Sequence, residues 1–149
     1  MKQGKVIEVL VRGVCLKEGK LLVCQSKGAG NTYLPGGHVE WHERAEESLR
    51  REIKEELGLK ARVGEFLGAV EHTFVQEGER HCEVNVVFEM DIPAVKPDAD
   101  PDACEDWITF RWIPLRRLGA YSLEPWPLRK LIPQWVKKGV GFRRWGSTI

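Results

Sequence analysis

The segment from Gly36 to Leu59, GGHVEWHERAEESLRREIKEELGL, restricts what this chain can fold into more than any other part of the sequence. Its apolar residues recur with the period of an α-helix, yet Glu52, Glu55 and Glu56 lie within little more than one helical turn. Like charges at this spacing repel one another and destabilise an isolated helix. The folded protein must therefore provide something that offsets this repulsion.

A helix is predicted over about residues 44 to 57, with one apolar stripe. At about 100° per residue the stripe consists of Ala45, Leu49, Ile53 and Leu57. Glu56 falls within this stripe and Glu52 about 20° outside it, whereas Glu55 lies further round the helix. Arg51 lies about 100° from Glu52, so we expect it to point away from this acidic edge.

Acids at the buried edge of a helix indicate a cation site. Carboxylates that are close together and partly buried cannot all stay ionised unless a cation joins them. Mg²⁺ takes oxygen ligands and usually keeps water molecules and substrate phosphates in its coordination sphere. The alternative is a charged surface helix with solvated acids, but such a helix would place its acids opposite the apolar stripe.

The spacing of the residues around these acids resembles that of a known family. The match is to the fixed positions of the 23-residue Nudix box. They are filled here by Gly37, then after five residues by Glu43, and then after seven residues by REIKEELGL. The flanking YLPGGHVE and the order of the predicted strands also look Nudix-like. The resemblance implies the Nudix fold, an α/β/α sandwich with a mixed β-sheet. It would form one domain over residues 1–149, with residues 139–149 as a peripheral tail.

The resemblance also implies a chemistry, the metal-dependent hydrolysis of a pyrophosphate bond in a nucleoside diphosphate linked to another moiety. It assigns the binding of Mg²⁺ or Mn²⁺ to Gly37, Glu52, Glu55 and Glu56, and catalysis to the three glutamates. The sequence does not decide which glutamate is the general base. Glu43 and Arg51 are implied to form a salt bridge that braces the loop before the helix.

Further candidates lie outside these fixed positions. Glu105 precedes the predicted strand WITFRWI, in a region from which relatives often supply another metal-binding or basic glutamate. It is equally well explained as a solvated acid in an acidic loop. Glu40 has a possible supporting role at the metal. Tyr33, Phe74 and Trp107 are candidates to stack on a nucleobase, because aromatic rings offer large apolar faces.

Two histidines flank a predicted hairpin turn at residues 76–80. His72 and His81 are expected to face each other across this hairpin, and together with Cys82 they suggest a metal site. His81 and Cys82 are consecutive in a strand, however, so their side chains point to opposite faces. We therefore favour a surface pair or a pair that contacts substrate.

The C-terminal part contains a predicted helix over residues 123–138, although Pro127 and Pro133 interrupt its pattern. The tail that follows interleaves aromatic and basic residues from Phe142 to Trp145. This pattern can bind nucleic acid, which leaves an RNA-interacting protein as one hypothesis. A segment that docks on its own domain or on a partner subunit is favoured, and a homodimer stays open.

Composition restricts the partners. The chain has 149 residues and a net charge of +1, which argues against a nucleic-acid partner or a membrane surface. The N-terminal apolar stretch contains Glu8 and Arg12, and this excludes a signal peptide or a spanning helix. The four cysteines are widely spaced without a CxxC pair, as expected in a reducing cytoplasm.

Two classes of function compete. The first is a metal-dependent pyrophosphohydrolase of small nucleotides, and the second is a non-catalytic Nudix-fold module that binds nucleotides. Such modules typically have a degraded box, whereas this box is intact. ADP-ribose-directed relatives tend to have a proline where this chain has Phe74, and diadenosine polyphosphate relatives a tyrosine near Gln76. These differences favour a nucleoside triphosphate or an unassigned nucleotide derivative.

Overall fold

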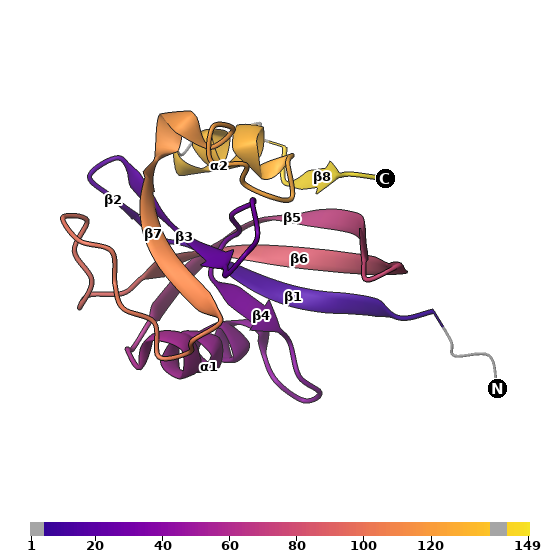
Figure 1. Cartoon of the computed structure of the whole chain (residues 1–149), viewed down its shortest axis with the longest axis horizontal. Coiled ribbons are helices and arrows are strands. Elements are labelled where there is room, and N and C mark those ends of the chain that lie inside the picture. Colours follow the sequence, from indigo (N-terminus) through magenta and orange to yellow (C-terminus); the bar gives the residue numbers. More distant parts are fainter. Residues whose placement is uncertain (1–4, 138–142) are drawn as a thin grey trace.

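The apolar segments of the sequence form eight strands in a computed structural model that describes residues 5–137 and 143–149. Two α-helices cover these strands from opposite sides (Figure 1). In chain order the elements are β1 (Ile7–Val14), β2 (Leu16–Lys17), β3 (Lys20–Ser26), β4 (Gly36–His38), α1 (Ala45–Leu57), β5 (Arg62–Gln76), β6 (Glu79–Asp91), β7 (Ile108–Pro114), the 3₁₀-helix η1 (Leu115–Arg117), α2 (Leu128–Val136) and β8 (Trp145–Ser147).

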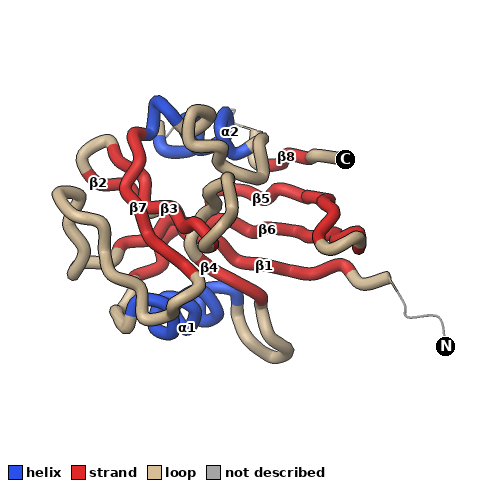
Figure 2. The backbone as a smooth tube through the Cα atoms, viewed as in Figure 1, coloured by secondary structure: helices blue, strands red, loops and turns tan. Residues whose placement is uncertain are grey.

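The larger sheet is mixed. Its strand order is β4-β1-β6-β5-β8, in which β1 runs parallel to β6, and β8 runs parallel to β5. The other neighbours, β4 with β1 and β5 with β6, are antiparallel. With a helix on each side, this arrangement confirms the predicted α/β/α fold with a mixed sheet (Figure 2).

The longest strands, β5 and β6, form the predicted hairpin. Its two turn residues, Glu77 and Gly78, have positive φ angles of 52° and 82°. Two consecutive residues with positive φ give a tight turn whose twist matches that of the flanking strands. The turn fixes the register, so Phe74 lies opposite His81. His72 lies opposite Glu83, and the expectation that His72 and His81 face each other is therefore wrong.

The smaller sheet, β2-β3-β7, contributes to the packing on both sides. Successive side chains of a strand point to opposite faces, and β3 illustrates this. Leu21 and Val23 pack in the apolar core that contains α2, whereas Leu22 and Cys24 pack in the core that contains α1. The two cores hold the helices in place on either side of the sheets.

Helix α1 has the predicted apolar stripe. Leu49 and Ile53 are fully buried, and Leu57 is 5% exposed. The helix ends at Gly58, whose left-handed conformation with φ of 69° allows its N–H to bond to the carbonyl of Lys54. The stripe therefore faces the core and leaves the acidic edge of the helix at the border of that core.

Helix α2 covers the opposite side and is shorter than predicted. It spans Leu128–Val136, and Pro127 occupies the position before its first residue. Proline is tolerated at a helix start, because the N–H it lacks would have no partner there. Trp135 packs so closely on Gly68 that a Cβ atom at residue 68 would overlap the indole ring. No helix in the described parts of the chain is long and apolar enough to cross a membrane.

The C-terminal residues return to the larger sheet. Trp145, Gly146 and Ser147 of β8 pair with Ala69, Val70 and Glu71 of β5, and β8 forms an edge of the sheet (Figure 1). The described part of the tail is thus docked on its own chain. Phe142, which belongs to the aromatic and basic pattern of the tail, lies outside the described residues.

Candidate functional site

The acidic edge of α1 carries three glutamates that differ in burial. The Glu56 residue is only 5% exposed, whereas the side chains of Glu52 and Glu55 are 15% and 53% exposed. This order is the one that the helical periodicity predicts. We call Glu52, Glu55 and Glu56 the carboxylate cluster.

Glu56 lacks a partner for one of its oxygens. Its Oε2 atom is buried and accepts no hydrogen bond from any residue that the structure describes. Burial is the main cause that raises the pKa of Glu56 to about 8, and the negative charges of Glu52, Glu55 and Glu105 raise it further. Arg12 acts in the opposite sense. A buried carboxylate with an unsatisfied oxygen is costly unless a proton or a cation joins it.

Strand β4 lies directly beside the cluster. A Cβ atom at Gly37 would overlap the carboxylate of Glu52, so only glycine allows this close approach. Burial raises the pKa of Glu52 too, although Arg51 and Arg12 partly oppose this effect. The cluster is therefore enclosed by backbone on one side.

The loop before α1 is braced as the sequence predicts. Arg51 donates from Nε to Glu43 Oε2 at 2.7 Å and from Nη2 to Glu43 Oε1 at 2.9 Å. This bidentate pair is the strong geometry for a guanidinium and a carboxylate. The Arg51 guanidinium is the main cause that lowers the pKa of Glu43 to about 2. His38 adds its carbonyl, which accepts from Arg51 Nη2 and from Ser48 Oγ.

Arg51 does more than the helical wheel predicts. Its Nη1 atom lies 3.0 Å from Glu52 Oε1 and 3.4 Å from Glu55 Oε1. The expectation that Arg51 points away from the acidic edge is therefore wrong, because its long side chain reaches beyond the position of its own Cα. The pair with Glu43, and after it the contact with Glu52, raise the pKa of Arg51.

The cluster fits a hard divalent cation by its donor chemistry. Within residues 5–137 and 143–149, no three His, Cys, Asp or Glu side chains converge as a ready-made metal site. Arg51 instead bonds to Glu52 and Glu55. The donors are all oxygens, however, and the unpartnered Oε2 of Glu56 lies in a region of negative charge. Oxygen donors with net negative charge are the ligands that Mg²⁺ and Mn²⁺ prefer.

A cavity of about 520 Å³ is lined by Arg12, whose charge acts on the cluster. Tyr33 and Phe74 line it, whereas Trp107, the third predicted stacking residue, does not. Its other lining residues come from β1, β5, β6, the loop after β3 and the start of α2, and include Arg12, Asn31, His72, Gln76, Glu83, Asn85 and Glu124. The volume and the mixed polar and aromatic lining suit a small-molecule ligand. We call this cavity the lateral pocket.

A row of polar contacts joins three lining residues of the lateral pocket, and the last of them, Arg12, acts on the carboxylate cluster through its charge. Asn85, which is 1% exposed, donates to Glu83 Oε2 at 3.3 Å and accepts from Arg12 Nε at 3.2 Å. The Arg12 guanidinium lies over the ring of Tyr33 and lowers the pKa of both Glu52 and Glu56. Arg12 therefore provides positive charge at the end of the pocket nearest the cluster. Glu83 makes the other end negative.

Phe74 is less available for stacking than the sequence suggests. The ring centroids of His72 and Phe74 are 5.2 Å apart, and those of Phe74 and His81 are 4.9 Å apart with 9° between the ring planes. Phe74 thus already makes a stacked contact with each of the two histidines. Of these two histidines, His72 lines the pocket together with Phe74.

The remaining predicted residues lie around the cluster or apart from it. Glu105 is exposed, but it is near enough to contribute to the raised pKa of Glu56. The carbonyl of Glu56 accepts from the N–H of Cys104, which places this loop against the end of α1. Glu40 is 66% exposed and lies 3.7 Å from Arg51. Trp107 lies just before β7 and is 48% exposed.

Sequence reasoning missed Arg12 and Asn85 as site residues. Each is a polar residue inside an otherwise apolar strand, in VLVRGV and VNVV respectively. A polar residue at such a position needs a buried partner. Its presence in an apolar strand was therefore the feature of the sequence that could have identified it as a site residue. What the pattern does not show is that β1 and β6 are neighbours, with Arg12 and Asn85 two pairs apart on the same face.

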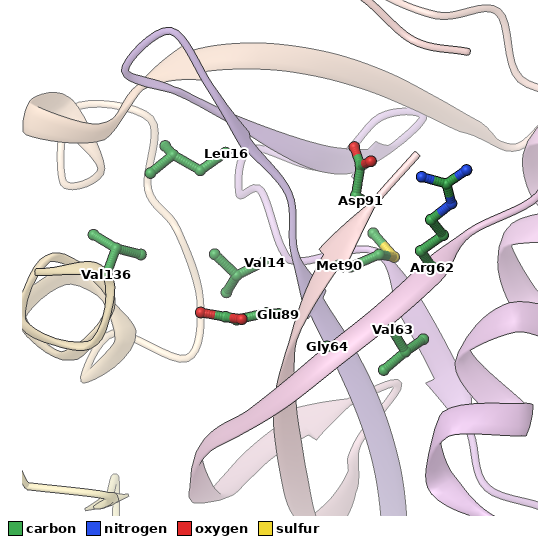
Figure 3. Close-up of a pocket in the computed structure, with 9 residues that line it drawn as sticks. All are labelled: Val14, Leu16, Arg62, Val63, Gly64, Glu89, Met90, Asp91 and Val136. Atoms are coloured by element: carbon green, nitrogen blue, oxygen red, sulfur yellow. The ribbon is translucent and has the colours of Figure 1, made fainter. Parts of the chain in front are cut away.

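A second cavity, of about 380 Å³, contains none of the predicted site residues. Figure 3 shows Val136 of α2 on one side of it, and Arg62 and Asp91 on the other. Most of its lining is apolar, and Asp91 is already paired with Lys17 at 3.2 Å. The carboxylate cluster and the lateral pocket are therefore the better candidate site.

Known proteins resemble this chain over most of its length. The family model for the NUDIX domain matches residues 5–135. An ADP-ribose pyrophosphatase of Methanocaldococcus jannaschii is 36% identical over 100 residues, which are 65% of this chain and 58% of that protein. The chain thus spans less than two thirds of the length of that relative.

Two further proteins are similar to this chain, one in sequence and one in structure. An isopentenyl-diphosphate Delta-isomerase of Cereibacter sphaeroides is 33% identical over 124 residues, which are 78% of this chain and 68% of that one. The MutT protein from Methanosarcina mazei Go1 has a similar structure, with a TM-score of 0.68 and 26% identity. That similarity covers 91% of this chain and 97% of the other.

Proposed function

The chain belongs to the NUDIX domain family, and on this premise we propose that it hydrolyses a pyrophosphate bond in a nucleoside diphosphate derivative with the help of Mg²⁺ or Mn²⁺. The observation that carries the proposal is Glu56. Its buried carboxylate has an unpartnered oxygen and is influenced by the charges of Glu52 and Arg12, and Arg12 also lines a pocket large enough for a nucleoside. A fold that needed Glu56 only for stability would pair this oxygen.

Glu52, Glu55 and Glu56 would hold the cation, together with the backbone at Gly37. A bound divalent cation would supply positive charge to the pyrophosphate oxygens and acidify a nearby water molecule. In the reaction, a water oxygen forms a bond to one phosphorus, and the bond from that phosphorus to the bridging oxygen breaks. A glutamate of the cluster accepts the proton of the water, and the leaving phosphate takes the bridging oxygen.

Arg12 would orient the substrate. Its guanidinium lies between the lateral pocket and the cluster, where it can bind a phosphate oxygen by charge-assisted hydrogen bonds. Asn85 and the carbonyl of Leu34 accept from this guanidinium and hold it in place. The negative charge of Glu83 disfavours phosphate at the far end of the pocket. The nucleoside would therefore occupy the far end, with its phosphates next to Arg12.

The pocket favours a nucleoside over an isoprenoid, the substrate in the name of the similar isomerase. A branched hydrocarbon chain gains binding energy from apolar walls. The lateral pocket instead has Arg12, His72, Glu83 and Asn85 among its lining. Burial of these groups against a hydrocarbon would remove water from them without replacing its hydrogen bonds.

The test is a substrate panel assayed with Mg²⁺, with Mn²⁺ and with chelator. It contains the four common nucleoside triphosphates, ADP-ribose and isopentenyl diphosphate, with product analysis by chromatography and phosphate release. We expect hydrolysis of at least one nucleotide that requires a divalent cation and is lost in Glu56→Gln. Nucleotide binding without turnover would indicate a non-catalytic module, and conversion of isopentenyl diphosphate alone would overturn the proposal.

A further inference from the structure

The C-terminal strand reaches the wall of the lateral pocket through one residue, Thr148. Its N–H donates to the carbonyl of Glu71 at 3.2 Å, which extends the pairing of β8 with β5 by one residue. Its hydroxyl Oγ1 accepts from the N–H of Thr73 at 3.1 Å and lies 3.0 Å from Nδ1 of His72. His72 is a lining residue of the pocket.

The protons of this arrangement can follow one of two patterns. The hydroxyl of Thr148 has one hydrogen to donate and already accepts from Thr73. If the hydroxyl donates to Nδ1 of His72, the neutral imidazole carries its proton on Nε2. If Nδ1–H instead donates to Thr148, the hydroxyl hydrogen has no acceptor among the described residues. Only the first pattern leaves a ring N–H donor for a ligand.

The surroundings of His72 favour this neutral form. Burial is the largest effect on its pKa and lowers it, although Glu83 and Glu124 act in the opposite sense. On one side the ring stacks on Phe74. In the structure, Nε2 has no hydrogen-bond partner among residues 5–137 and 143–149. When Thr148 donates to Nδ1, Nε2–H is therefore a donor available to a ligand in the pocket.

We propose that Thr148 is a positioning residue that holds His72 as the Nε2–H tautomer, and that His72 donates a hydrogen bond from Nε2 to an acceptor atom of the substrate nucleobase. This inference rests on the proposed function for the identity of the ligand. Glu83 lies opposite His72 in the β5–β6 register. The two residues place a donor and an acceptor side by side, which is the pattern that the edge of a nucleobase complements.

The location of this pair agrees with a nucleobase rather than a phosphate. Glu83 and Glu124 both face this end of the pocket with negative charge, whereas Arg12 lies towards the cluster. Glu124 is already paired with Arg129 at 2.8 Å, so Glu83 is the carboxylate that a phosphate at His72 would meet without a matching cation beside it. The tail consequently supports a residue that lines the pocket, His72, although the sequence suggests that the tail is peripheral.

The first test needs no turnover. Proton–nitrogen NMR of the histidine rings, with His72→Gln to assign the signals, reports which nitrogen carries the proton. We expect wild-type His72 to be neutral with the proton on Nε2, and Thr148→Val to shift the population towards the Nδ1–H form. Thr148→Ser, which retains the hydroxyl, should keep the wild-type tautomer. A wild-type His72 protonated on Nδ1 would overturn the inference, whether or not the chain is a hydrolase.

The second test separates recognition from general damage. For the best nucleotide substrate, Thr148→Val should raise KM about tenfold with kcat within about twofold, because it weakens one contact to bound substrate. For a sugar diphosphate without a nucleobase, KM should stay within about twofold. Thr148→Ser should behave as wild type with both. An equal rise of KM for both substrates, or an unchanged KM for the nucleotide, would contradict the inference. If no substrate is turned over, calorimetric titration with the same two ligands replaces KM.

Discussion

Two glutamates at the ends of the same site lie in opposite electrostatic surroundings. Glu43 forms two short hydrogen bonds with Arg51, which lower its pKa to about 2. Glu56 is buried beside other acids, its pKa is raised to about 8, and one of its oxygens has no partner among the described residues. We call the first the braced end of the site and the second the open end.

The contrast shows which part of the site is structural and which part awaits a ligand. At the braced end, the charge of Glu43 is matched within the protein, so this end holds the loop before α1 without help. At the open end, Arg12 is the main opposing charge on Glu56, and it is not bonded to it. A fold that tolerates such a carboxylate is less stable than it would be with a neutral side chain there.

The largest effect is expected from removal of the Glu56 charge, which tests the assignment of the open end as the cation site. Glu56→Gln keeps the shape of the side chain but removes one anionic ligand from the proposed cation site. We expect turnover to fall by roughly a thousandfold, because stabilisation of the reacting phosphate is worth several kcal/mol. Without metal the variant should be as stable as the wild type or more so. The measurements are the hydrolysis rate against Mg²⁺ concentration, and thermal melting in chelator.

Glu46→Gln is the matched control for this variant. Glu46 lies in the first turn of α1, outside the carboxylate cluster, so its loss should change turnover by less than about threefold. Turnover near that of the wild type in Glu56→Gln would contradict the assignment of the cation to the open end. Collapse of its fold in chelator would show that the Glu56 charge is needed for structure.

The second prediction concerns stability against pH in the metal-free protein. Because the folded-state pKa of Glu56 is raised to about 8, the folded chain holds a proton between about pH 4.5 and 8 that the unfolded chain releases. Stability should therefore fall as pH rises through this window. The loss is on the order of 4 to 5 kcal/mol, or about 15 °C in melting temperature.

The comparison of wild type with Glu56→Gln isolates this effect. His72 acts in the opposite sense, since its lowered pKa makes the folded chain more stable as pH rises through the range in which the unfolded imidazole loses its proton. Both proteins contain His72, so the difference between their melting curves in chelator reports Glu56. Parallel curves from pH 5 to pH 8 would show that Glu56 is ionised in the metal-free protein.

The sequence predicts the parts of the site that depend on local periodicity. The depth of Glu56 and the exposure of Glu55 follow from their angular positions on one helix. The bond between Arg51 and Glu43 was implied by the spacing of the family motif. The β5–β6 hairpin also follows from local pattern and turn residues, whereas the mixed sheet was implied by the resemblance to the family.

What the sequence does not predict depends on long side chains and on strand neighbours. The reach of Arg51 to Glu52 and Glu55 is longer than a wheel of Cα positions suggests. The contact of Arg12 with Asn85 requires that β1 and β6 be parallel neighbours. The pairing of Phe74 with His81 could have been predicted from the sequence, because a two-residue turn at Glu77 and Gly78 fixes the register of the hairpin.

A third prediction tests the braced end. Arg51→Ala removes the partner of Glu43 and the bonds to the carbonyl of His38, so the loop before α1 loses its brace. We expect turnover to fall about thirtyfold, since displacement of catalytic groups by even a short distance is costly. The melting temperature should also fall, by roughly 5 °C. Activity assays and calorimetry measure the two effects.

Arg51→Lys sharpens this test, because lysine keeps the charge but lacks the two-pronged geometry. It should recover only part of the lost stability. If Arg51→Ala loses activity with its melting temperature unchanged, Arg51 contacts the substrate directly, and the division into a braced end and an open end is wrong. The contacts of Arg51 with Glu52 and Glu55 make this outcome a real alternative.

The smallest expected effect concerns Glu105, at the border of the open end. Glu105 is exposed, and it is the weakest of the named influences on the pKa of Glu56. If it acts only through this distant charge, Glu105→Gln should lower the pKa of Glu56 slightly and change turnover by less than about threefold.

Asp106→Asn is the control, since Asp106 is a neighbouring exposed acid that is not among those influences. A loss of a hundredfold or more in Glu105→Gln, with Asp106→Asn unaffected, would instead make Glu105 a ligand or the general base. The open end would then extend beyond α1 to the loop before β7.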